Sequence, residues 1–139
     1  MFGKKINNLW VIRLIKGEEI LSCLKSFCQK NKINTASING IGAVDFVKIG
    51  FFDPVTKQYF TKEYKEDLEI TSLLGNLSIR EQDLHLHLHI NLANANFEVI
   101  GGHLYAATIS VTAEIIITEI GQQIERHLDA ETGLYLLSL

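Results

Sequence analysis

Hydrophobic and polar positions alternate along most of the chain, and a helical period replaces this alternation in one stretch. From Glu18 to Lys32, apolar residues recur three and four positions apart, with acidic residues at the start and lysines near the end. This stretch predicts an amphipathic helix. Residues 9–15, rich in apolar and β-branched types, predict a strand before it. The whole pattern predicts an α+β fold, in which one main helix covers a mostly antiparallel sheet.

Short apolar stretches separated by turn residues follow the expected helix. Residues 36–52 include several glycines, so we expect one bent strand or two, with a bulge near Gly40. Residues 68–79 predict a strand interrupted at Gly75-Asn76. The remaining expected strands are 58–64, 84–92, 97–110, 111–120, 123–128 and 134–137. No linker-like segment separates these elements, and we expect a single domain over residues 1–139.

Composition and charge narrow the classes of function. The 139 residues are 47% hydrophobic, enough for a real core, and the net charge of −3 argues against a strongly basic nucleic-acid-binding face. No run of 18 apolar residues and no signal-peptide pattern occurs, so we expect a cytoplasmic protein without a membrane partner. Cys23 and Cys28 lie five positions apart in the expected helix, which predicts two free thiols.

Two apolar segments near the end of the chain suggest self-association. Residues 113–120 break the strict alternation, which indicates burial on both faces of a strand. The last five residues, YLLSL, are also unusually apolar. Both features favour an oligomer.

Residues 84–92 alternate without a break. Leucines and one isoleucine point to one side, and the other side carries His85, His87, His89 and Asn91. The apolar side belongs in a core. The opposite side is therefore a row of imidazoles.

Strand geometry limits which histidines share an ion. Side chains two positions apart start about 7 Å from each other, whereas His85 and His89 start about 13 Å apart, too far for a common metal. The strand therefore offers either His85 with His87 or His87 with His89. His103, after Gly101-Gly102, is placed to supply a third ligand from a neighbouring strand. The competing interpretation is a polar sheet face, or a histidine row at a subunit interface, without metal.

Four segments resemble the PPC domain, named for its conservation in plants and prokaryotes. Residues 87–104 (HLHINLANANFEVIGGHL) resemble its His-x-His strand followed by Gly-Gly-His-Leu. Residues 39–59, 69–78 and 126–137 resemble its Gly-Ile-Gly-Ala, Glu-Ile-x-Ser-Leu-x-Gly-Asn and closing Arg-x-x-Asp-x-x-Thr-Gly-Leu patterns. The resemblance implies a stand-alone prokaryotic member with a PPC-like α+β fold that assembles as a homotrimer.

The same resemblance implies a divalent-metal site. Carried over to this chain, its ligands are His87, His89 and His103, and Zn²⁺ is the expected ion. His85 is an addition upstream of the usual pair and a candidate supporting group. Glu69 is a second candidate support, as a carboxylate in an apolar strand that either acts as a general base or faces solvent.

Members of this family are commonly described as DNA-binding, because plant relatives join the domain to AT-hook motifs. This chain has no Arg-Gly-Arg-Pro core, and Asp67 stands where an arginine is expected. The plant-type interaction segment aligns with residues 66–71 and keeps only Glu69 and Ile70. The resemblance implies DNA or another regulatory protein as a partner, without an AT-hook.

Three functions compete at this point. The expected one is a homotrimeric, DNA-binding or regulatory module with a three-histidine metal site, and not an enzyme. The alternatives are a Zn-dependent enzyme acting on a small molecule through metal-activated water, and a metal-free structural trimer. A cupin-like site is disfavoured because the nearest glutamate, Glu98, follows His89 by nine positions. Arg126 and Asp129 are expected to form a structural turn contact, with a tight turn at Thr132-Gly133.

Overall fold

The computed structural model describes residues 1–139 as nine strands and one helix. The mostly antiparallel sheet and the single helix predicted from the pattern are both present. In chain order the elements are β1 (Phe2–Ile6), β2 (Leu9–Ile15), α1 (Ile20–Lys30), β3 (Ala36–Asp53), β4 (Gln58–Tyr64), β5 (Leu68–Arg80), β6 (Asp83–Ala93), β7 (Val99–Glu119), β8 (Arg126–Leu128) and β9 (Tyr135–Leu137).

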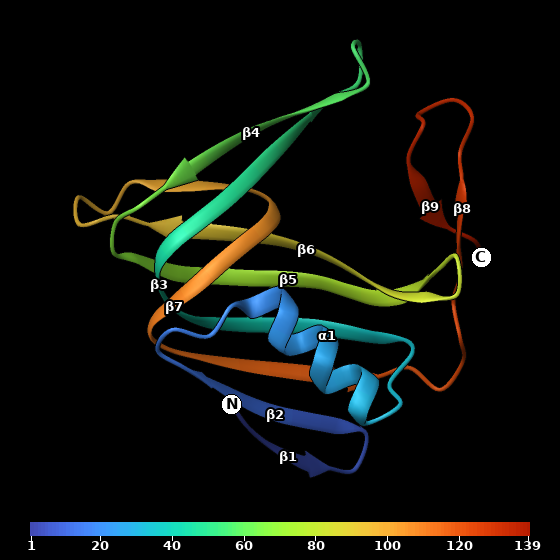
Figure 1. Cartoon of the computed structure of the whole chain (residues 1–139), viewed down its shortest axis with the longest axis horizontal. Coiled ribbons are helices and arrows are strands. Elements are labelled where there is room, and N and C mark those ends of the chain that lie inside the picture. Colours follow the sequence, from blue (N-terminus) through green and yellow to red (C-terminus); the bar gives the residue numbers. More distant parts are fainter.

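Two long strands organise the main sheet, in which seven strands follow the order β1-β2-β7-β6-β5-β3-β4 (Figure 1). Strand β7 pairs with β6 near its start and with β2 near its end, while its other edge pairs with β3. Strand β3 in turn pairs with β5 and then with β4. Because β7, β6, β5 and β3 pair in a closed ring, the sheet curls around its own apolar face.

The helix contributes its apolar side to the same core. Glu19 is the N-cap, and its carboxylate accepts hydrogen bonds from the backbone N–H groups of Leu21 and Ser22 and also from that of Ala107 in β7. These bonds fix the start of α1 against β7. The buried helix residues that join the core cluster of the sheet are Ile20, Leu24, Phe27 and Cys28. Cys23 and Cys28 are both free thiols.

Several expected boundaries differ from the structure for local reasons. Strand β1 was not predicted, because all of its residues are exposed and carry no core-facing alternation. Strand β7 is one continuous strand, although the sequence predicted two. Strand β5 runs through Gly75 without the predicted interruption, since this glycine lets the His87 backbone approach closely where a Cβ would collide. The bulge near Gly40 is confirmed by a register shift between Gly40 and Gly42.

Two hairpins stand beside the same part of the sheet. The β3–β4 hairpin and the separate β8–β9 hairpin rise on the same side of β5 and β6 (Figure 1). Their tips meet where Lys57 Nζ donates a hydrogen bond to the Glu131 carbonyl oxygen at 2.5 Å. They therefore flank the strand that carries the histidine row. No helix has the length and apolar character needed to cross a membrane.

Candidate metal centre

Strand β6 presents its histidines on the face that points away from the core. Leu88, Ile90 and Leu92 are fully or almost fully buried on the core side, as the alternation predicted. On the other side His87 lies opposite Asn76 of β5, and His89 lies opposite His103 of β7. Strands β5 and β7 therefore flank the row on β6, and β7 brings His103 beside the β6 pair.

Two glycines allow β7 to approach its neighbours at this point. A Cβ at Gly101 would collide with the Asn91 side chain, and one at Gly102 would collide with the carbonyl oxygen of Gly50 in β3. Neither position tolerates a larger residue without movement of a strand. The pair placed before His103 in the sequence thus sets the spacing of β6, β7 and β3 around the site.

His87, His89 and His103 converge. Each offers one ring nitrogen, and the three nitrogens lie within 4.8 Å of one another. The ring centroids are 5.1–5.4 Å apart. A tetrahedral zinc ion with Zn–N distances of about 2.0–2.1 Å holds its ligand atoms about 3.4 Å apart. Small side-chain rotations therefore bring these nitrogens to ligand distance.

Two observations show that the residues fit a metal ion. The Nδ1 atom of His103 is buried and has no hydrogen-bond partner, which is costly for an imidazole nitrogen unless a ligand occupies it. Burial, followed by the charges of neighbouring histidines and, for His87, of Arg126, lowers the pKa of His87 and His103 to about 4. Both rings are therefore neutral at pH 7, the form that binds a metal.

A cavity of about 380 Å³ opens over this cluster. His85, His87 and His103 line it from the sheet, together with Arg80 of β5 and Tyr105 of β7, and the flanking hairpins supply the rest. The rings of Tyr59 and Tyr105 pack against His103 at centroid distances of 5.4 and 5.0 Å. No aspartate or glutamate lines the cavity, and its other lining residues are Arg126, Gly133, Leu134, Tyr135 and Leu136.

Arg126 is buried beside His87 and does not contact Asp129, so the predicted Arg126–Asp129 turn contact is wrong. Asp129 instead accepts hydrogen bonds from the backbone N–H and the hydroxyl of Thr132, closing the predicted tight turn. The guanidinium of Arg126 points to β5 and β6. The alternation of β8 gave no sign of this long-range contact, which depends on how the hairpin docks.

The other predicted residues lie outside the three-nitrogen cluster. His85 lines the cavity, with its ring centroid 6.5 Å from that of His87. Glu69 is exposed at the start of β5, opposite Ala93, and does not line the cavity. The structure therefore gives Glu69 no contact through which to support the cluster.

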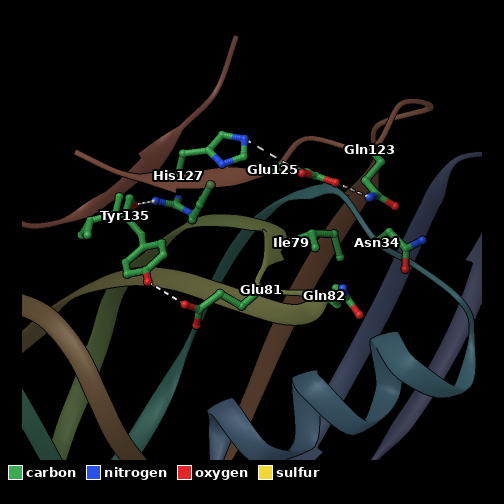
Figure 2. Close-up of a pocket in the computed structure, with 10 residues that line it drawn as sticks. Asn34, Ile79, Glu81, Gln82, Gln123, Glu125, His127 and Tyr135 are labelled. Carbon is green, nitrogen blue, oxygen red and sulfur yellow. Dashed lines mark hydrogen bonds and ion pairs between the residues drawn. The ribbon is translucent and has the colours of Figure 1, made fainter. Parts of the chain in front are cut away.

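His127 belongs to a different surface. It lies on β8 near Glu125, 4.0 Å away, in a cleft formed by the hairpin and the β5–β6 turn (Figure 2). Figure 2 also shows Tyr135 reaching across to Glu81, to which its hydroxyl donates a hydrogen bond of 2.6 Å. His127 thus has a carboxylate neighbour and an exposed position, unlike the clustered histidines.

Comparison with known proteins gives relatives over the full fold. A protein from Archaeoglobus fulgidus described as metal-containing is 33% identical, with a TM-score of 0.88 over 97% of this chain and 96% of its own. A plant- and prokaryote-conserved (PPC) protein from Pyrococcus horikoshii is 35% identical, with a TM-score of 0.87 over 97% of this chain and 94% of its own. A candidate DNA-binding protein from Bacteroides thetaiotaomicron is 33% identical, with a TM-score of 0.95 over 99% of this chain and 96% of its own.

Comparison with curated proteins gave no match. The sequence profile described as the Plants and Prokaryotes Conserved (PCC) domain matches residues 1–121, which include α1, the long strands and all three clustered histidines. Together with the resemblance of the four sequence motifs, this match identifies the family. The chain belongs to the Plants and Prokaryotes Conserved domain family.

Proposed function

We propose that His87, His89 and His103 bind one divalent ion, Zn²⁺, and that the protein is a metal-carrying regulatory or binding module. The convergence of three ring nitrogens carries this proposal. Neutral imidazoles are common ligands of zinc, and the buried Nδ1 atom of His103 needs a partner. The description of the A. fulgidus relative as metal-containing supports the same assignment.

The cavity favours binding over catalysis. Three protein ligands leave one position of a tetrahedral ion free for a ligand from solution, and His87 and His103 both line the cavity. A zinc enzyme usually also needs a base or acid placed near the reacting atoms. This cavity contains no carboxylate, and Glu69 lies elsewhere. The enzyme alternative therefore has a binding space but no carboxylate in it to act as the base.

We further propose that the module assembles as a homotrimer, as the family resemblance implies. Three large apolar side chains support self-association: Val11, Ile41 and Leu74 point away from the core and are 41%, 58% and 56% exposed. They line one groove on the outer face of the sheet. Light scattering at neutral pH is expected to give three times the chain mass of 15.6 kDa. A monomer mass would contradict this assembly.

DNA is a candidate partner because relatives from B. thetaiotaomicron and Ralstonia eutropha are described as candidate DNA-binding proteins. The net charge of −3 gives this chain little attraction for phosphates. We propose that regulation acts through a protein partner or a bound ligand and not through a strong direct grip on DNA. A tight duplex-DNA complex that weakens steeply with salt would contradict this part of the proposal.

The metal site is tested by metal analysis of protein purified without a histidine tag. After chelator treatment, calorimetric titration with Zn²⁺ is expected to give one ion per chain. His103→Ala is expected to weaken binding by more than about 100-fold, since even groups behind the ligands affect affinity by about 10–100-fold. His127→Ala is the matched control and is expected to bind zinc as the wild type does. Equal affinity in the His103→Ala and wild-type proteins would overturn the proposal.

A further inference from the structure

Arg126 is a buried cation without an anionic partner. The residue is 6% exposed, and burial lowers the pKa of its guanidinium from the ordinary value. None of the ion pairs in the structure includes Arg126. A buried charge is costly unless it is paired and its hydrogen-bonding groups are satisfied. In this structure the N–H groups of Arg126 are satisfied only in part, and its charge has no anionic partner.

The four contacts of the guanidinium all involve neutral groups. Its Nε donates to Ser78 Oγ at 2.8 Å, and its Nη1 donates to the Tyr135 carbonyl oxygen at 2.8 Å. Its Nη2 donates to Asn76 Oδ1 at 2.9 Å and lies 3.3 Å from His87 Nδ1. Because a guanidinium has five N–H donors, one N–H of Nη1 has no partner even when all four contacts count.

Metal binding at His87 removes one of these contacts. A neutral imidazole has one nitrogen with a free lone pair and one that carries the proton. If the metal binds Nδ1, the lone pair that faces Arg126 is used. If it binds Nε2, Nδ1 carries the proton and faces Arg126 as a second donor. In both cases Nη2 of Arg126 loses its acceptor at His87.

The lining of the cavity offers no anion to take over this role. No acidic residue lines the cavity, and its second cation, Arg80, stacks on the Tyr135 ring with its guanidinium carbon 3.6 Å from the ring centroid. Arg80 is paired with Glu81 at 3.6 Å, outside the cavity lining, and its own Nε is buried without a hydrogen-bond partner. A divalent ion on three neutral imidazoles adds two positive charges. The metal-loaded cavity therefore has a strong excess of positive charge.

We propose that this cavity binds a small carboxylate, which the Arg126 guanidinium holds next to the proposed ion. The inference rests on the proposed metal site. Arginine presents its donors in a planar fork that matches a carboxylate. Tyr59, Tyr105, Leu134 and Leu136 supply apolar surface for a short carbon chain. The cavity volume of about 380 Å³ is sufficient for a small organic ligand.

The test uses cobalt-loaded protein, because Co²⁺ replaces Zn²⁺ and its visible absorption reports a new ligand. Titration with sodium propionate is expected to give a saturable spectral change in the wild type, whereas metal-free protein is expected not to bind propionate by calorimetry. By linkage, a ligand that binds only the metal-loaded protein must also tighten metal binding, so saturating propionate is expected to increase the affinity for Co²⁺. Absence of the spectral change in protein that holds Co²⁺ would overturn this inference alone. Failure to bind Co²⁺ or Zn²⁺ would overturn the metal site itself.

Variants assign the carboxylate to Arg126. Arg126→Gln is expected to weaken propionate binding about 10-fold or more, because it removes a charge-assisted hydrogen bond. The matched control, Lys30→Gln, removes an exposed positive charge at the end of α1, outside the cavity, and is expected to bind as the wild type does. Unchanged propionate affinity in Arg126→Gln would overturn the assignment to Arg126. If the wild type bound inorganic phosphate more tightly than propionate, the assignment of a carboxylate would also be overturned.

Arg126 also holds the β8–β9 hairpin, so a second variant separates binding from folding. Ser78→Ala removes one hydrogen bond of Arg126 and keeps its charge, and we expect propionate affinity within about threefold of the wild type. If Arg126→Gln lacks the wild-type circular dichroism spectrum, Arg126→Lys replaces it, with an expected loss between those of Gln and the wild type. Equal propionate affinities of Arg126→Lys and the wild type would contradict the need for the planar fork of a guanidinium.

Discussion

The two faces of β6 follow one alternating pattern but differ in what stabilises them. On the core face, Leu88, Ile90 and Leu92 are almost fully buried and pack with the sheet and helix. On the outer face, His87 is partly buried beside His103 and Arg126, in a cavity whose lining contains no acid. The first face gains stability from burial alone. The second keeps neutral rings, an orphaned nitrogen and a buried cation close together.

This contrast shows what the site needs from its surroundings. An apolar face is complete when it is covered, because burial itself is favourable. A face with unpaired polar atoms is complete only when a ligand binds them. The outer face of β6 therefore carries the signature of a binding site, and changes on the two faces should have separable effects.

The largest expected effect on folding comes from the core face. Leu88→Ala is expected to lower the free energy of unfolding by about 2–5 kcal/mol, because it leaves a cavity at a fully buried position. His87→Gln, the neighbour on the opposite face, is expected to change the stability of the metal-free protein much less. Chemical denaturation of the two variants checks the difference. Equal losses would mean that the outer face is structural.

The next largest effect is the gain in stability on zinc binding, which should differ between variants of the two faces of β6. Zinc at 100 times its dissociation constant is expected to raise the free energy of unfolding of the wild type by about 2.7 kcal/mol. Leu88→Ala should keep this increment, since it leaves the three imidazoles in place, and His87→Gln should lose it. Denaturant titration with and without zinc measures both. An increment that survives in His87→Gln would place the zinc elsewhere.

A smaller effect concerns pH. The pKa of His87 and His103 is about 4 in the folded protein because of burial, below the ordinary value of 6.5. Between pH 6.5 and 4 the unfolded chain therefore binds more protons than the folded one. The free energy of unfolding of the metal-free protein is expected to be constant above pH 7 and to fall as the pH drops through this window. In a His87→Gln/His103→Gln double variant this fall should be smaller, and an unchanged curve would contradict the burial of the two rings.

The smallest effect extends the comparison to α1, where Cys28 faces the core and Cys23 is only partly buried. Burial raises the pKa of the Cys28 thiol to about 12, so almost no thiolate is present at pH 8. A disulfide reagent is expected to modify no more than one thiol in the native protein, at Cys23, and to reach Cys28 only after unfolding. Mass spectrometry locates the modified residue, and rapid native labelling of Cys28 would show that the helix is not packed as described.

The local sequence pattern predicted much of this fold, but few of the residues that line the cavity. The alternation of residues 84–92 identified both faces of β6, and the Gly101-Gly102 pair indicated a close approach of His103. Both signals are local, because side-chain direction in a strand depends on position alone. Strand β1 escaped prediction because its exposed residues have no periodic contrast.

The wall of the cavity depends on contacts between distant segments. Arg126 lies 39 positions from His87, and Tyr59 reaches His103 only because β4 pairs with β3 at that point. No short-range spacing encodes such contacts. A carboxylate in an apolar strand suggests a buried acid at Glu69, but the position of this residue on β5 places it opposite Ala93 and away from the histidines.

The most direct test of the metal site is a crystal structure of zinc-loaded protein with data collected above and below the zinc absorption edge. One anomalous peak per chain is expected, about 2.0–2.1 Å from a ring nitrogen of each of His87, His89 and His103. The same map is expected to show a group bound to the ion on the side of Arg126. A peak at His127 and Glu125, or no peak at the cluster in zinc-saturated crystals, would contradict a zinc site at the three histidines.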